Sequence, residues 1–109
     1  MLATLSRLQS TGERPLNIRR LVLDVDKARA RPSLLEIGEA IAGCAGVQAF
    51  NLTVGEIDIE TVGMDITIEG ENLSYEQIAS AIDSTGAVVH SIDQLVAGDR
   101  VIEGVARLR

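Results

Sequence analysis

Residues 47–69, VQAFNLTVGEIDIETVGMDITIE, decide the fold because they predict a β-hairpin. Apolar and polar residues alternate along residues 47–60 and again along 62–69, a pattern that is typical of half-buried strands. The alternation of the first strand flips at Gly55-Glu56, and one extra residue there restores it, so we predict a β-bulge. The short segment 61–63 contains a glycine and joins the two strands as a turn.

The hairpin lies between two predicted helices, and each helix begins with the pattern of a capping box. Ser33 has Glu36 three residues later, and Ser74 has Gln77 at the same spacing. In both cases an apolar stripe follows at helical spacing, which supports the two helix starts. The second helix ends at Gly86, because glycine is the usual residue just past a helix C-terminus.

Two further strands complete the predicted order strand, helix, strand, strand, helix, strand. They are residues 18–26 (IRRLVLDVD) and 87–96 (AVVHSIDQLV). Right-handed connections of this split type predict an α+β, ferredoxin-like βαββαβ sandwich, with a four-stranded antiparallel sheet and two helices on one face. The other face must meet water or a partner. We expect residues 1–17 to be a flexible N-terminal extension, 18–103 the domain, and 104–109 a C-terminal tail.

Composition excludes several functional classes. Aromatic residues are only 2% of the 109, and the net charge is −6. Few rings are therefore present for base stacking, and the acidic balance disfavours nucleic acid and anionic membranes as partners. Cys44 is the single cysteine, so no intrachain disulfide can form, and no apolar run has the length of a membrane span. We expect a cytoplasmic protein with neither nucleic-acid nor membrane partners.

Strand alternation predicts which side chains point away from the helices. The first strand and the second hairpin strand contribute Arg20, Val22, Asp24, Asp65, Thr67 and Glu69. For the last strand two sets remain open, either Val89, Ser91 and Asp93 or Val88, His90 and Ile92. We favour the first set because it keeps Val88 and Ile92 for the core, which leaves His90 pointing inward or near an edge.

The acidic residues on this face suggest a cation site. No Lys or Arg occurs between residues 32 and 99, so counter-charge must come from cations or from arginines of a neighbouring subunit. Oxygen ligands without a Cys/His set favour Ca²⁺ or Mg²⁺ over zinc. The alternative is a solvated acidic surface with no specific site. The candidate metal ligands are Asp24, Asp26, Glu56, Asp58, Glu69 and Asp93.

Catalytic signals are poor. The sequence contains no phosphate loop, no dinucleotide fingerprint and no G-x-S-x-G elbow. Cys44 lies at a helix end, where the dipole raises a thiol pKa, and a free cysteine of this kind is usually a small buried side chain. His90 is the only imidazole, and nothing in the sequence supplies it with a nucleophile. We expect no enzymatic activity and no organic cofactor.

Six stretches resemble the domain of unknown function 211 family, which is best known from archaea. They are IRRLVLDV (18–25), PS (32–33), GV (46–47), VGEID (54–58), ITIEG (66–70) and, most specifically, HSIDQLVAG (90–98). The resemblance spans about residues 18–103. It implies a ferredoxin-like fold, assembly into closed homo-oligomeric rings with calcium in some members, and no known enzymatic activity.

Two functions follow as hypotheses. The first is a homo-oligomeric, ring-forming binding or scaffold protein that holds Ca²⁺-like divalent cations through its carboxylates. In this hypothesis the uncovered sheet face and the C-terminal tail make the subunit contacts. The alternative is a regulatory sensor that binds a small metabolite at subunit interfaces, with the glycines near Gly43–Gly46 or Gly98 lining the pocket.

Overall fold

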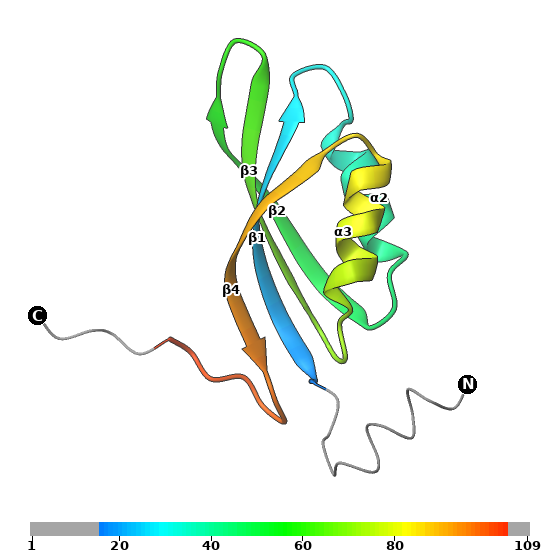
Figure 1. The fold of residues 1–109 in the computed structure, drawn as a ribbon, viewed down its shortest axis with the longest axis vertical. Coiled ribbons are helices and arrows are strands. Elements are labelled where there is room, and N and C mark those ends of the chain that lie inside the picture. Colours follow the sequence, from blue (N-terminus) through cyan, green and yellow to red (C-terminus); the bar gives the residue numbers. More distant parts are fainter. Residues whose placement is uncertain (1–15, 105–109) are drawn as a thin grey trace, which may run out of the picture.

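The computed structural model describes residues 16–104, which form a four-stranded antiparallel sheet with two helices packed on one face (Figure 1). The elements are β1 (Ile18–Ala28), α2 (Leu34–Ala42), β2 (Val47–Ile57), β3 (Thr61–Gly70), α3 (Tyr75–Ser84) and β4 (Val88–Ala97). The strand order is β2-β3-β1-β4, which confirms the ferredoxin-like prediction. The predicted extension 1–17 and tail 104–109 lie almost entirely outside the described residues. Within those residues, no helix combines the length and the apolar character that crossing a membrane requires.

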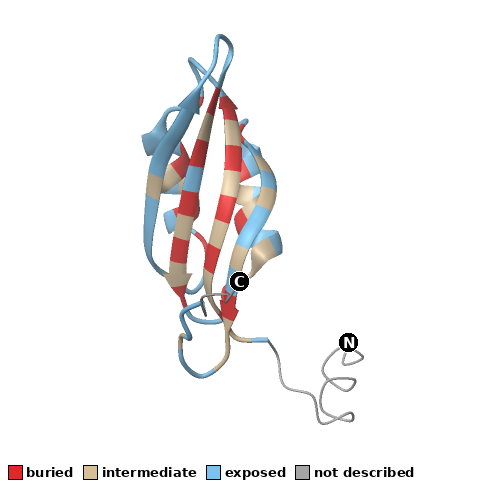
Figure 2. Cartoon of the chain, turned by 90° about the vertical axis from the view of Figure 1, so that its left-hand side faces the viewer, coloured by how far each residue is buried: buried red, intermediate tan, exposed pale blue. Residues whose placement is uncertain are grey.

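The core lies between the helices and the two central strands. Leu21, Leu23 and Val25 of β1 are fully buried, and β3 contributes Met64, Ile66 and Ile68 in the same alternation. Figure 2 shows this alternation on β1 and β3, whereas the outer strands β2 and β4 are mostly exposed or half-buried. The inward faces predicted for the first strand and for the second hairpin strand are therefore confirmed.

The two helix starts differ in how completely they are capped. Ser33 accepts a hydrogen bond from the Glu36 backbone N–H, and the Glu36 side chain accepts one from the Ser33 N–H, so the first predicted capping box is complete. Ser74 also accepts from the Gln77 N–H, but the Gln77 side chain accepts from the Ala45 N–H instead of reaching back. The second capping box is thus half-formed, because its glutamine is used to hold the end of the first helix.

Register shifts occur where one strand carries an extra residue. The predicted bulge of the hairpin is confirmed, since the pairing of β2 with β3 shifts between Val54 and Glu56. The pairing of β4 with β1 shifts three times, and these shifts reset the alternation of β4. The favoured assignment for this strand is therefore wrong in part. Val89 pairs with Val25 on the helix side, and Val88 pairs with Asp26 on the opposite side.

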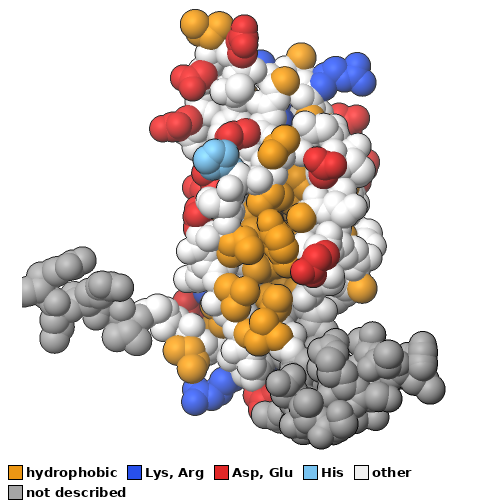
Figure 3. Space-filling view, in the orientation of Figure 1, with side chains coloured by type: hydrophobic (Ala, Val, Ile, Leu, Met, Phe, Trp, Pro, Cys, Tyr) orange, Lys and Arg blue, Asp and Glu red, His pale blue; other side chains and the backbone are white. Residues whose placement is uncertain are grey.

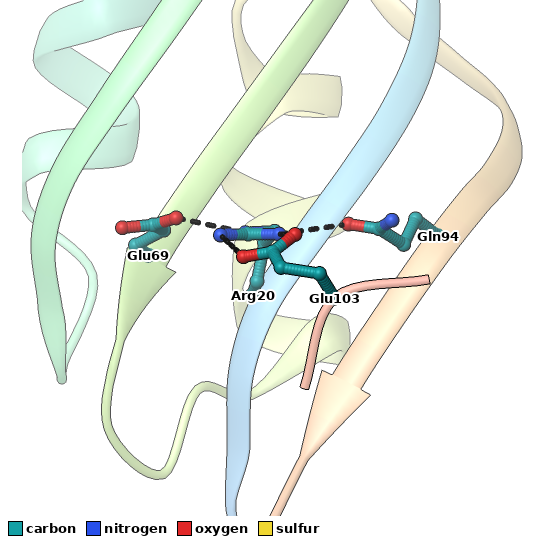
Figure 4. A network of polar contacts seen from close by, with 4 residues as sticks. All are labelled: Arg20, Glu69, Gln94 and Glu103. Carbon is teal, nitrogen blue, oxygen red and sulfur yellow. Dashed lines mark hydrogen bonds and ion pairs between the residues drawn. The ribbon is translucent and has the colours of Figure 1, made fainter. Parts of the chain in front are cut away.

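The chain reverses after β4 and comes back over the sheet. Gly98 has a φ of 120°, a conformation that favours glycine, and its N–H donates to the carbonyl of Asn17. Residues 98–104 form neither helix nor strand. They bring Glu103 over the sheet face opposite the helices, which we call the open face (Figure 4).

Candidate cation site on the open face

One end of the open face holds a hollow of about 510 Å³ lined mainly by acidic side chains. We call it the acidic hollow. Its lining residues are Asp24, Asp26, Gly55, Glu56, Gly63, Met64, Asp65, His90 and Asp93. Four strands contribute to it, so the hollow depends on the register of the whole sheet rather than on any one segment.

Strand pairing brings the acidic groups together. Asp24 of β1 pairs directly with Asp65 of β3, so two carboxylates stand side by side on the open face. Asp26 pairs with Gly63, which in turn pairs with Glu56. Because like charges on directly opposed residues destabilise a sheet, this arrangement carries an energetic cost that a bound cation would relieve.

Gly63 leaves open the floor of the hollow between two of these carboxylates. A Cβ at this position would lie 3.4 Å from an Asp26 side-chain oxygen and 4.0 Å from the Glu56 Cβ. Any larger side chain would therefore fill the space between the β1 and β2 acidic groups. The missing side chain gives the two carboxylates a common opening.

His90 is the one lining residue that can carry a positive charge among those the structure describes. Its Nδ1 lies 3.8 Å from the Asp24 Oδ2, which is a loose contact at an exposed site. Ser91 pairs with Asp24 across the strands, and its hydroxyl donates to Asp93 at 2.8 Å. Within residues 16–104, no three His, Cys, Asp or Glu side chains already stand in the arrangement of a metal site. A cation would have to draw the carboxylates together.

Four of the six candidate ligands line the hollow, namely Asp24, Asp26, Glu56 and Asp93. Asp58 lies in the hairpin loop, where its backbone N–H donates to the Thr61 carbonyl. Asp65 was placed on this face by the sequence but was not among the candidate ligands. The signal for Asp65 as a ligand was present in the sequence, because strand alternation puts it on the same face as Asp24.

Glu69, the sixth candidate, belongs to a separate cluster around Arg20 (Figure 4). The Arg20 Nε donates to Glu69 at 2.7 Å, and its two terminal nitrogens donate to the Glu103 carboxylate at 3.1 and 3.2 Å. The Nη1 also donates to the Gln94 side chain at 3.4 Å. This fork-shaped contact lowers the pKa of Glu103 and raises that of Arg20. Glu69 is thereby paired with Arg20 and lies apart from the acidic hollow.

The two groups considered for catalysis, Cys44 and His90, lie in different surroundings. Cys44 is buried, its thiol donates weakly to the Ala40 carbonyl, and burial raises its pKa. A thiol held in its neutral form is a poor nucleophile. His90 is largely exposed, and Asp24 is the acidic group beside it.

The glycines considered for a metabolite pocket differ in their surroundings. A Cβ on Gly46 would lie 2.2 Å from the Glu71 carbonyl oxygen, whereas a Cβ on Gly98 would meet no atom within 4 Å. Gly43 lines a hollow of about 470 Å³ between α2 and α3.

The fold and the open face together define a small α+β domain of ferredoxin-like topology with an acidic hollow on its sheet. A family model described as "Uncharacterized ArCR" (DUF211) matches residues 19–109. The chain is also 41% identical over 88 residues to "Uncharacterized protein MJ0319" of Methanocaldococcus jannaschii, a match that covers 81% of this chain and 90% of that protein. The chain therefore belongs to the DUF211 family.

Proposed function

We propose that this protein is a cytoplasmic binding module that works as a cyclic homo-oligomer and holds divalent cations in its acidic hollow. The observation that carries the proposal is the hollow itself. Five carboxylates line it, and no Lys or Arg is among the lining residues that the structure describes. Carboxylates gathered in this way repel one another, and a bound cation offsets that repulsion.

The chemistry of the hollow favours a hard cation. Ca²⁺ takes about six to eight oxygen ligands in a flexible geometry, and Mg²⁺ keeps several waters and needs one or two carboxylates. The Asp24–Asp65 pair offers adjacent carboxylates, and Glu56 and Asp26 face the opening above Gly63. Ca²⁺ fits better, because separated carboxylates can close around a larger and less demanding ion.

Calorimetric titration with CaCl₂ and MgCl₂, after removal of metals with a chelator, tests this proposal. We expect saturable Ca²⁺ binding to the wild-type protein, and at least a tenfold weaker affinity in Asp24→Asn and Asp65→Asn. Asp58→Asn is the matched control, because it removes one acidic charge outside the hollow. A wild-type protein that takes up no Ca²⁺ would overturn the proposal, as would equal affinities for all three variants.

We propose binding rather than catalysis as the activity. The Cys44 thiol is buried, and burial raises its pKa, so it is a poor nucleophile.

A metabolite sensor is the second candidate. Its support is an apolar groove of about 400 Å³ between α2 and β2, which includes Leu35 and Phe50. A thermal-shift screen separates the two functions. Stabilisation by Ca²⁺ with none by small metabolites supports the first function, and the reverse supports the second.

A further inference from the structure

A groove between α2 and β2 is open within the part of the chain that the structure describes. It has a volume of about 400 Å³, and its lining residues are Leu34, Leu35, Gly38, Glu39, Ala42, Phe50 and Leu52. Leu35 is 79% exposed on the helix wall, and Phe50 is 39% exposed on the strand wall. Apolar side chains that face water across a concave surface favour an occupant that covers them.

The groove exists because α2 has more apolar residues than the sheet can cover. Ile37 and Ile41 are fully buried, whereas Leu35 lies off this buried stripe. Gly38 lies so close to Phe50 that a Cβ would be 3.3 Å from the ring. The close approach of helix and strand at this glycine fixes the position of the two walls.

The sequence before residue 16 contains side chains that match the groove. Residues 1–15, which we call the N-terminal segment, read MLATLSRLQSTGERP and include Leu2, Leu5 and Leu8. A spacing of three puts these leucines within about 120° on one face of a helix, whereas the period of two in a strand would put Leu5 on the opposite face from the other two. The pattern predicts a short amphipathic helix, and such helices bind in apolar grooves.

The predicted helix and the groove have similar lengths. Six residues of helical rise separate Leu2 from Leu8, which is about 9 Å. The helix wall of the groove extends from Leu35 to Ala42, seven residues of rise or about 10 Å. Three leucines can therefore contact the groove along its whole length.

The described chain begins at the same end of the sheet as the Ala42 end of the groove (Figure 1). β2 begins shortly after α2 ends at Ala42, and it pairs with the end of β3. β1 begins beside this end of β3, because Arg20 pairs with Glu69. The path from residue 16 to the groove crosses two strand spacings and one helix–sheet layer, about 15 Å in all. Residues 9–15 span up to about 25 Å when extended, which is enough.

Charge favours the same contact. The N-terminal segment has Arg7 and Arg14 against one acidic residue, Glu13, so its side chains sum to +1 and leave −7 of the net −6 on the rest of the chain. Glu39 lines the groove, and Glu36 lies in the first turn of α2. Opposite net charges attract the segment towards this helix.

A second apolar surface lies at the other edge of the sheet. Figure 3 shows apolar side chains gathered in a band along β4, beside α3. Ile92 and Leu95 of this strand are 43% and 46% exposed. A leucine that enters the α2–β2 groove is contacted by two walls, so it loses more of its contact with water there than on the surface of one strand. The groove is therefore the better site for the segment.

We propose that the N-terminal segment docks in the α2–β2 groove of its own chain, with Leu2 towards Leu35 and Leu8 towards Ala42. The proposal is independent of cation binding and of self-association. The family model matches residues 19–109, so the segment lies outside the matched domain. A metabolite or a partner protein that binds in the groove must first displace the segment, which makes the segment a built-in competitor for this site.

A tryptophan in the groove reports whether the segment is docked. The chain contains no Trp, so Phe50→Trp gives a single fluorescent reporter in the strand wall. In this background we compare Leu5→Gln/Leu8→Gln with Ala3→Gln/Ser10→Gln, a matched control outside the leucine stripe. We expect each lost leucine to lower the ratio of docked to undocked chains about tenfold or more. The leucine variant should then emit at longer wavelength and be quenched more strongly by acrylamide, with no change in the control.

Disulfide trapping tests the position of the segment without relying on fluorescence. In a Cys44→Ala background, Leu5→Cys with Leu35→Cys should form a disulfide within one chain under mild oxidation. Leu5→Cys with Leu95→Cys is the control pair on the β4 band and should stay reduced. Denaturing electrophoresis without reductant separates links within one chain from links between chains, and peptide mass spectrometry identifies the linked residues. Far-UV circular dichroism checks the folding of each variant, and Leu35→Trp replaces Phe50→Trp as the reporter if that variant fails to fold.

Three results would overturn the proposal. The first is equal emission and quenching in the leucine variant, the control and their parent. The second is a link from residue 5 to residue 95 in preference to residue 35, which places the segment on the β4 band. The third is a link between residues 5 and 35 of different chains, which places it on a neighbouring copy. Neither test depends on Ca²⁺ or on the number of subunits, so this inference and the proposed function can fail separately.

Discussion

Asp24 and Asp65 are the residues in which stability and proposed function oppose each other. They face each other across β1 and β3 on the open face. Replacing Asp65 by Asn removes one of two like charges, so in the absence of metal we expect the free energy of unfolding to rise by about 0.2–1 kcal/mol. Added Ca²⁺ should then stabilise Asp65→Asn less than the wild type. Urea denaturation with and without Ca²⁺ measures both effects, and a less stable metal-free variant would contradict the account.

Glu103 links the C-terminal segment to β1 through Arg20. The guanidinium donates two hydrogen bonds to this carboxylate and holds its pKa below the ordinary value. A carboxyl whose pKa is lower in the folded state stabilises that state above its unfolded pKa, and the contribution disappears as the pH falls through the folded pKa. We therefore expect the contact to open in acid.

Carboxyl NMR titration checks this prediction directly. The Glu103 pKa should lie below its ordinary value in the wild type and return to that value in Arg20→Gln. An unchanged Glu103 pKa in Arg20→Gln would show that the fork-shaped contact does not form in solution.

Cys44 has a buried thiol, and its burial raises the pKa of that thiol. A group with a raised folded pKa stabilises the fold below its unfolded pKa, and that stability is lost as the pH rises through the folded pKa. We expect the wild type to lose stability between neutral and alkaline pH more steeply than Cys44→Ala does. Urea denaturation across this range measures the difference, and parallel pH profiles would contradict the prediction.

At the scale of elements, the inner strands were predictable and the outer strands were less so. β1 from Leu21 onward and the whole of β3 alternate regularly and bury Leu23 and Ile66, because each strand is paired on both sides. β4 carries extra residues that reset its alternation, so Val89 faces the core against the favoured prediction. Such shifts depend on how one strand fits its neighbour, and a single sequence does not contain that information.

The candidate site was also predictable only in part from the sequence. Strand alternation placed Asp24 and Asp65 on the face away from the helices, and the structure pairs them directly across β1 and β3. Alternation gives the face but not the position along the strand. It could not separate Glu69, which lies at the Arg20 end of β3, from Asp65 in the hollow. Nor could it show that the turn after β4 returns Glu103 to Arg20.

The close approach of the end of β3 to the turn before β2 gives a prediction for Gly70. A Cβ there would lie 1.9 Å from the Gly46 carbonyl oxygen, and backbone cannot move away as a flexible side chain would. We expect Gly70→Ala to lower the free energy of unfolding by about 1–3 kcal/mol or more. Gly55→Ala is the control in a neighbouring strand, because its Cβ would meet the nearest atom at 3.7 Å. Equal effects in urea denaturation would refute the argument.

At the scale of the whole molecule, two unfinished surfaces require different partners. The open face has surplus negative charge in its hollow, and the sheet edges have unpaired backbone beside apolar side chains. The proposed function assigns cations to the first surface and further copies of the chain to the second.

Native mass spectrometry of the wild-type protein, recorded after chelation and again with added Ca²⁺, tests the central claim most directly. The account predicts a single closed assembly whose mass is a whole multiple of the chain, and at least one Ca²⁺ retained for each subunit in the second sample. A species with the mass of one chain in both samples, with no retained metal, would contradict it.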